Sequence, residues 1–401
     1  MDAEHKPLPL SGVRVIELGT LIAGPFCSRI LAEFGAEVIK IELPKVGDPL
    51  RNWRILHNGT SLWWYVQSRN KKCISLDVRT EPGLEVVKNL LKESDVLIEN
   101  FRPGTLAKWG LTSEVLKELN PHLIVSHISG YGQTGPYSNR PGFGAIGEAM
   151  GGLRYLTGYP DLPPVRVGIS LGDSVAALYS VIGILLALYY RDTRNGGGQE
   201  IDIALYEAIY SLMEGLVPEY DKKGVIRERT GSAFPGVVPT NTYLTKDKRY
   251  VVLAANGDNI FQRLLKVMGR EDLIGDKRFL TNEDRVRNRD IVEALIEEWV
   301  SQKTLEDCLQ ILNENAIPAG RIYNAEDIVH DPHYQARGMV LEVEHVELGK
   351  VKVPGIVPKL SQTPGQIKWL GPKIGQHNLE LLKKIGLSED QIKEMEERGV
   401  I

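Results

Sequence analysis

The first half of the chain alternates short apolar runs with helical patterns, and this alternation restricts its fold more than any other feature of the sequence. Strands are predicted at residues 13–18, 36–42, 73–76, 95–99, 123–128 and 199–203. Helices are predicted at 85–92 and 113–119. Pro25 suits the first turn of another helix that ends near Phe34, because proline lacks the amide hydrogen that this position leaves unpaired. Repeated strand–helix–strand units indicate an α/β fold with a parallel sheet that is covered on both faces.

The pattern changes after about residue 220. Residues 221–236 are rich in charge and glycine and are predicted to form a linker or mobile loop. A hairpin at 242–245 and 250–255 is predicted next, followed by helices at 259–268, 290–300 and 305–313 and a second hairpin that turns at 348–349. In the middle one of these helices, one face is predicted to pack on a core through Ile291, Leu295, Ile296 and Trp299.

Composition limits the partners and the compartment. The 401-residue chain has a formal net charge of −4, so we expect no nucleic-acid or membrane partner, and an anionic ligand needs local donors. The three cysteines, Cys27, Cys73 and Cys308, form no CxxC motif, which favours a reducing cytoplasm. Residues 1–10 are predicted to be a short disordered lead-in. The apolar run 175–190 falls short of the ~20 residues that span a bilayer and is predicted to form a buried core helix.

The common cofactor motifs are missing from the sequence. The first strand leads into residues 19–25 (GTLIAGP), which lack the GxGxxG spacing that a dinucleotide requires. The chain contains no GxxxxGK[ST] phosphate loop and no HExxH zinc motif. We therefore expect neither a nucleotide cofactor nor a bound metal.

One segment matches the GxSxG pattern of serine hydrolases. In residues 168–172 (GISLG), Ser170 would be the nucleophile, and a helix follows as that reading requires. No HGGG-type oxyanion loop precedes it. The downstream histidines that would have to supply the base are His330, His333, His345 and His377. A serine hydrolase is therefore one alternative for this chain.

Asp173 follows in the same segment, directly before the long apolar helix. As an N-cap, its carboxylate would accept a hydrogen bond from the helix and interact well with the helix dipole. As a nucleophile, it would be fixed in direction by the helix start, while Gly172 would let a large substrate approach. The residues alone leave both roles open.

Several segments follow one another in order along essentially the whole chain: 23–25 (AGP), 31–42 (LAEFGAEVIKIE), 47–49 (GDP), 70–72 (NKK), 99–104 (ENFRPG), 129–136 (SGYGQTGP), 172–173 (GD), 196–207 (GGGQEIDIALYE) and 317–320 (IPAG). Together they resemble the class III CoA-transferase family, the formyl-CoA transferase and carnitine-CoA transferase type. The resemblance implies a Rossmann-like large domain over 1–220, a smaller α+β domain over 221–335, and a segment over 336–401 that returns to the large domain. It also implies an interlocked homodimer.

The resemblance further implies that Asp173 attacks the thioester of an acyl-CoA and forms a mixed anhydride. CoA then passes to a second carboxylic acid without ATP, provided that water is excluded. Succinyl-CoA is a common donor in this family. We therefore expect a CoA-transferase whose partners are an acyl-CoA and a carboxylic acid, with the CoA thioester as substrate and no cofactor.

The resemblance also assigns the residues around Asp173. Four of them are in addition candidate phosphate donors because they lie at the ends of predicted strands or just beyond: Lys71, Lys72, Arg102 and Lys108. The residues expected to bind CoA and the acyl group are Leu21, Ile22, Ala23, Lys71, Lys72, Asn100, Phe101, Arg102, Lys108, Tyr131 and Gly132. The residues expected to form the acceptor pocket are Trp53, Trp63, Gly231, Phe234 and Gly236.

Two departures from the family bear on the substrate and the reaction. Ile22 stands where formyl-CoA:oxalate members have glutamine, and Phe234 lies in what is a glycine-rich run in those members, so a larger or less polar acid than oxalate is expected. The family also contains α-methylacyl-CoA racemases, which need a base on each face of the α-carbon. Phe143 stands where their histidine falls. A racemase is the second alternative.

Overall fold

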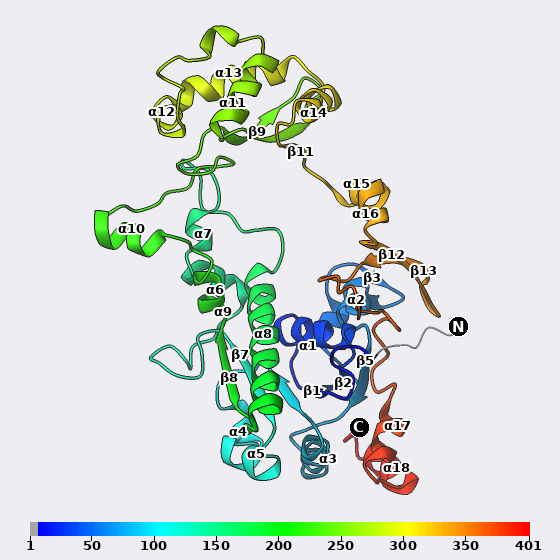
Figure 1. Ribbon diagram of the computed structural model, residues 1–401. Coiled ribbons are helices and arrows are strands. Elements are labelled where there is room, and N and C mark those ends of the chain that lie inside the picture. Colours follow the sequence, from blue (N-terminus) through cyan, green and yellow to red (C-terminus); the bar gives the residue numbers. More distant parts are fainter. Residues whose placement is uncertain (1–6) are drawn as a thin grey trace. The chain divides into compact units, whose positions relative to one another are not determined.

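The computed structural model describes residues 7–401, which form two compact units (Figure 1). The first unit runs to Arg154 and also contains Arg166–Pro218 and Gln335–Ile401, while the second contains Tyr155–Val165 and Glu219–Tyr334. The main division thus falls next to the boundary predicted at residue 220, and the C-terminal segment belongs to the first unit. That Tyr155–Val165 joins the second unit was not predicted.

A parallel sheet of six strands forms the centre of the first unit, with the strand order β5-β2-β1-β6-β7-β8. The strands are β1 (Arg14–Glu17), β2 (Glu37–Glu42), β5 (Lys71–Ser75), β6 (Val96–Glu99), β7 (Ile124–Ser129) and β8 (Glu200–Ala204). All were predicted, with bounds that differ by one or two residues. If these six strands are numbered along the chain, their order across the sheet is that of a Rossmann fold. The direction in which the order runs reverses between β1 and β6. The predicted α/β class with a parallel sheet is confirmed.

Helices cover both faces of this sheet. Successive side chains of each strand point to opposite faces and therefore pack in two different cores. Ile16 of β1 packs in one core and its neighbour Val15 in the other. The helices of the first core are α3 (Glu81–Lys92), α5 (Ser113–Leu119), α17 (Asn378–Lys384) and α18 (Glu389–Glu397). Those of the second core are α1 (Ala23–Glu33) and α8 (Leu171–Arg194).

Helix α8 lies beside α1 and against β7 (Figure 1). Its inner face is buried through Ala177, Ile184 and Leu188, whereas Leu178 and Leu186 on its outer face are exposed. The prediction of a buried core helix therefore holds for one face only. Within residues 7–401, α8 alone is long and apolar enough to cross a membrane, and half of its apolar stretch is buried in the protein.

The second unit packs helices on a small antiparallel sheet of order β11-β10-β9. On α13, Ile296 and Trp299 are buried as predicted, but Ile291 is exposed and Val292 takes its place in the core. The elements of this unit are β9 (Thr240–Leu244), β10 (Tyr250–Ala254), α11 (Asp258–Val267), η2 (Glu271–Leu273), α12 (Asn282–Arg287), α13 (Arg289–Ser301), α14 (Leu305–Glu314), β11 (Ala319–Arg321) and α15 (Ala325–His330).

The predicted disordered lead-in, 1–10, lies partly outside the described residues. Within them, Leu10 is buried and its N–H donates to the carbonyl of Phe34, so order begins earlier than predicted. The predicted linker 221–236 begins inside a helix, α10. The remaining elements are η1 (Pro49–Asn52), β3 (Leu56–His57), β4 (Thr60–Ser61), α2 (Leu62–Gln67), α4 (Thr105–Lys108), α6 (Gly144–Met150), α7 (Leu153–Leu156), α9 (Leu205–Tyr210), α10 (Leu216–Lys223), α16 (Pro332–Ala336), and the predicted hairpin β12 (Val340–His345) and β13 (Gly349–Pro354).

Candidate active site

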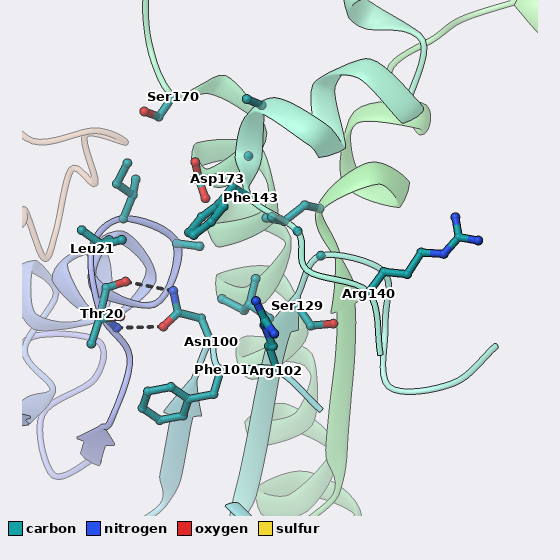
Figure 2. A pocket seen from close by; sticks show the side chains of 18 of the residues that line it. Thr20, Leu21, Asn100, Phe101, Arg102, Ser129, Arg140, Phe143, Ser170 and Asp173 are labelled. Atoms are coloured by element: carbon teal, nitrogen blue, oxygen red, sulfur yellow. Dashed lines mark hydrogen bonds between the residues drawn. The ribbon is translucent and has the colours of Figure 1, made fainter. Parts of the chain in front are cut away.

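A cavity of about 600 Å³ opens at the carboxyl edge of the parallel sheet, beside the point where the strand order reverses. Its walls are the loops that follow β1, β6 and β7 together with the starts of α6 and α8 (Figure 2). Open parallel sheets bind ligands at such a point, because the loops on its two sides diverge and leave a crevice. All residues that line the cavity belong to the first unit.

Asn100 ties the loop after β1 to the loop after β6. The N–H of Thr20 donates to Asn100 Oδ1 (2.7 Å), and Asn100 Nδ2 donates to the Thr20 carbonyl (2.9 Å; Figure 2). The next residue, Leu21, has a φ of 63°, which is unusual for a residue with a side chain, and its N–H donates to Asp48 Oδ1 (3.0 Å). Asp48 is buried and paired with buried Lys40 (2.8 Å). This wall of the cavity is therefore held in place without a ligand.

Asp173 reaches the cavity from the first turn of α8 (Figure 2). It is the third residue of that helix, and the N-cap position belongs to Ser170, so the predicted N-cap role of Asp173 is wrong. A Cβ built on Gly172 would lie 2.7 Å from the carbonyl oxygen of Gly144. The starts of α6 and α8 thus pack backbone to backbone, and glycine is required for this approach.

The environment of Asp173 disfavours its charged form. Its pKa is raised to about 6, first by burial and then by the nearby carboxylate of Glu148, against the opposing effects of Arg166 and of its own backbone N–H. A carboxylate with a raised pKa that faces a cavity is a candidate nucleophile. Above about pH 6 it is ionised and able to attack.

Glu148 of α6 lies beneath the helix start that carries Asp173. It is 1% exposed, and its Oε1 accepts a hydrogen bond from the N–H of Gly172 (3.3 Å). Its Oε2 lies 3.3 Å from a guanidinium nitrogen of Arg154 and 3.8 Å from Nε of Arg166. Glu148 was not predicted, because an acidic residue in a short helix normally points to solvent and nothing local marks this one as buried.

The cavity is rich in positive charge. Asp173 is the one carboxylate among the described residues that line it. An acidic protein that binds an anionic substrate needs such a local cluster. The arginines that line the cavity are Arg54, Arg102, Arg140 and Arg166, of which only Arg102 was predicted.

Seven of the sixteen predicted binding residues line this cavity. They come from three separate stretches of sequence that the sheet brings together at one edge. Beside Asp173, the predicted residues in its wall are Leu21, Ile22, Ala23, Trp53, Asn100, Phe101 and Arg102.

Two predicted lysines lie elsewhere. Lys71 is fully buried in an ion pair with Glu17 (2.8 Å), and Lys72 pairs with Glu37 (3.2 Å) and Glu380 (2.5 Å). Strand β5 starts at Lys71, two residues before the predicted start, so both lysines occupy the first positions of the strand. They lie at the amino end of β5, away from the cavity wall, and their prediction as phosphate donors is wrong.

A second group of predicted residues does not line the cavity: Lys108, Tyr131, Gly132 and Trp63. Tyr131 supports the wall, since a Cβ on Gly142 would lie 3.2 Å from its ring. Trp63 stacks on the guanidinium of Arg54, 4.4 Å from the ring centre. The other three acceptor-pocket residues belong to the second unit, and their role stays a prediction: Gly231, Phe234 and Gly236.

The geometry bears on both alternatives. Ser170 lines the cavity, but no histidine is found among the described lining residues, so a hydrolase would lack its base. Phe143 lies in the wall beside Asp173, where a racemase needs a side chain that carries a proton (Figure 2). His127 does not replace it, because its ring lies 2.6 Å from the carboxylate of Glu99 and outside the cavity lining.

A second hollow of about 290 Å³ adjoins the cavity and shares Thr20 and Phe101 with it. It lies beyond the carboxyl ends of β1, β2 and β5. Its walls are partly apolar, through Ile41 and Trp109, and they also contain Arg79, which is paired with Asp77 at 2.7 Å. The two spaces together form one elongated site along the sheet edge.

The chain is similar to several known proteins over nearly its whole length. Residues 10–378 match CoA-transferase family III. A succinyl-CoA–D-citramalate CoA-transferase of Chloroflexus aurantiacus is 48% identical over 403 residues, with all of both chains covered. The human succinyl-CoA:glutarate CoA-transferase is 33% identical, over 98% of this chain and 90% of the relative. The crystal structure of a CaiB/BaiF family protein from Brucella suis, 36% identical, superposes with a TM-score of 0.84 over 95% of this chain and 100% of that one.

Proposed function

This chain belongs to CoA-transferase family III and is a CoA-transferase, and from that premise we propose that it moves CoA from succinyl-CoA to a dicarboxylic acid through covalent intermediates on Asp173. The observation that carries the proposal is the position of Asp173, a carboxylate with a raised pKa in a cavity whose other charged side chains are arginines. Relatives named for succinyl-CoA with citramalate or glutarate support the choice of substrates.

The proposed chemistry keeps one activated acyl bond at every stage, either a thioester or an anhydride. The Asp173 carboxylate attacks the succinyl carbonyl, the C–S bond breaks, and CoA leaves as a thiolate. The thiolate then attacks the aspartyl carbonyl of the mixed anhydride, which releases succinate and leaves CoA on Asp173 as a thioester. The acceptor carboxylate displaces the thiolate to form a second anhydride, and the thiolate attacks its acyl carbonyl, which frees Asp173.

Backbone groups at the cavity are suited to stabilise the oxyanions of these steps. The N–H groups of Gly144 and Ala145 lie in the first turn of α6 and have no partner within that helix. Both residues line the cavity with Asp173. Donors that are fixed before the reaction stabilise developing negative charge more effectively than water does.

The elongated site matches a ligand as long as CoA. With the thioester beside Asp173, the pantetheine arm would pass Thr20 and Phe101, which the two hollows share. The adenosine end would then occupy the smaller hollow, whose walls are partly apolar; Arg79 in its wall is already paired with Asp77 at 2.7 Å. This placement replaces the contacts first expected from Lys71 and Lys72.

The proposal includes a homodimer that acts in the cytoplasm. The exposed apolar side chains of α8, among them Leu178, Ile182, Leu185 and Leu186, form a face of the kind that a second copy covers. The three cysteines are free and buried, which suits a reducing compartment. Interlocking of the two chains remains part of the proposal.

Exchange of CoA between acids tests this function. The protein is incubated with succinyl-CoA and one of a panel of acids (citramalate, malate, glutarate, oxalate, acetate), and the CoA thioesters are separated by liquid chromatography. We expect a new thioester of at least one dicarboxylic acid, equimolar release of succinate, and none of either with Asp173→Asn. Release of free CoA without a new thioester would instead indicate a hydrolase.

A further inference from the structure

Arg54 is held in the cavity wall in an unusual way. Its φ is 61°, in the left-handed region that side chains rarely adopt. Its guanidinium lies over the ring of Trp63, 4.4 Å from the ring centre. The ring centres of Trp63 and Trp53 are in turn 6.5 Å apart. Both Arg54 and Trp53 line the cavity. A surface arginine of this length is normally mobile, whereas this one is directed by its backbone and by stacking.

The charge of Arg54 has no carboxylate partner in the part of the chain that the structure describes. Arg51, three residues earlier, is by contrast neutralised by Glu42 at 2.7 Å. Stacking uses the faces of a guanidinium and leaves its N–H edge free, and that edge matches the two oxygens of a carboxylate. A fixed, unpaired guanidinium in a cavity wall is therefore a site for a carboxylate ligand.

The proposed substrates carry a second carboxylate that such a guanidinium could bind. In succinyl-CoA and in a dicarboxylic acceptor, one carboxyl group reacts and the other stays ionised throughout. A carboxylate that loses part of its water on entering the cavity is stabilised by a cation beside it. Donor and acceptor occupy the same place in turn, so one cation serves both half-reactions.

The other three arginines of the cavity are less suited to this task. Arg166 lies 3.8 Å from the carboxylate of Glu148 and is partly neutralised. Arg140 stacks on Tyr137 and points away from Asp173 (Figure 2). Arg102 directly follows Phe101, which lines both the cavity and the smaller hollow proposed for CoA. Its position therefore suits a contact with CoA better than one with the far end of the acid.

We propose, on the basis of the proposed function, that Arg54 is the specificity-determining residue that binds the non-reacting carboxylate of the dicarboxylic donor and acceptor. Arg54 does not touch the reacting atoms in this account. It selects substrates by their far end, and Trp63 sets its direction. A monocarboxylic acyl group of the same length gains nothing from it.

The test compares succinyl-CoA with butyryl-CoA, which has the same chain length and a methyl group in place of the carboxylate. For Arg54→Gln we expect kcat/KM for succinyl-CoA to fall about 10- to 100-fold, the usual loss for a charge-assisted contact. kcat/KM for butyryl-CoA should stay unchanged, so the preference for succinyl-CoA collapses. Arg54→Lys keeps the positive charge but lacks the parallel N–H groups of a guanidinium. Its preference for succinyl-CoA should lie between those of the unmodified protein and of Arg54→Gln.

Arg278→Gln is the matched control, because Arg278 also stacks on an aromatic ring, Phe279 at 5.0 Å, but lies in the second unit outside both hollows. Its substrate preference should equal that of the unmodified protein. If Arg54→Gln keeps the full preference for succinyl-CoA, the inference is wrong. If the unmodified protein transfers CoA from neither donor, it is the proposed function that fails.

Discussion

The backbone of Gly144 faces the carboxylate of Asp173 so closely that a Cβ built on Gly144 would stand 2.1 Å from Asp173 Oδ2. The contact joins the start of α6 to the one carboxylate among the described lining residues. Glycine at position 144 thus leaves room for the observed direction of the Asp173 side chain.

Gly144→Ala should therefore abolish most activity while the fold survives. Alanine is a favourable helix residue, and the atom it meets is the end of a side chain that can rotate away. We expect CoA transfer to fall at least about tenfold, because reacting groups displaced by about 1 Å lose much of their rate. The midpoint of thermal unfolding should change little. Gly168→Ala, where the new Cβ meets open space, is the control and should leave transfer unchanged.

The charge of Glu148 should set the pH at which Asp173 becomes active. The pKa of Asp173 is about 6 and is raised in part by Glu148, so kcat/KM for succinyl-CoA should fall as the pH drops through 6. Glu148→Gln removes the negative charge but keeps an oxygen to accept the Gly172 N–H. In this variant, the fall of kcat/KM on the acid side of the pH profile (the acid limb) should then occur at lower pH. An unmoved limb, or the same shift in the surface variant Glu85→Gln, would contradict this role.

Ionisation of Asp173 should cost stability. Its folded pKa of about 6 exceeds its ordinary value of 3.8, so the cost appears as the pH rises from about 4 to 6 and is fully present above 6. Asp173→Asn removes this cost. The variant should be more stable than the parent at pH 8 by roughly 1–3 kcal/mol, with the difference fading toward pH 4. Denaturant titrations at both pH values measure it, and a variant that is less stable at pH 8 would contradict the electrostatic account.

Asn100→Ala should weaken acyl-CoA binding more than it slows chemistry. The change removes both hydrogen bonds to Thr20 and frees the loop that carries Leu21. We expect KM for succinyl-CoA to rise roughly tenfold, in line with the loss of one or two hydrogen bonds. Asn120→Ala is the control, because Asn120 also donates to two backbone carbonyls, but far from both hollows. Equal effects of the two variants would rule out a local role for Asn100.

The strands and the site loops were predictable because their signals are local. Runs such as 36–42 concentrate β-branched residues within a few positions. The loop residues Leu21, Asn100 and Arg102 follow predicted strands whose carboxyl ends must meet. Lys72 shows the limit of that argument. It stands at the amino end of the predicted strand 73–76 and of the observed β5, so closeness to a strand end did not place it at the carboxyl edge where the cavity opens.

Residues whose roles come from distant contacts were missed. Glu148 is recognisable only once α8 is placed over it, and Arg54 only once Trp63 stacks on it. The short segment Tyr155–Val165 carries no pattern that links it to residues beyond 218. Ile291 was assigned to the core because ideal helical spacing cannot separate it from its neighbour Val292.

Trapping of the covalent intermediate tests the central claim most directly. The protein is mixed with succinyl-CoA, quenched with hydroxylamine and digested, and the peptides are mapped by mass spectrometry. Both the anhydride and the thioester on Asp173 should be converted to a hydroxamate, so the account predicts that modification on Asp173 in the unmodified protein and its absence without succinyl-CoA. A protein that exchanges CoA while Asp173 stays unmodified, or a label on Ser170 instead, would contradict it.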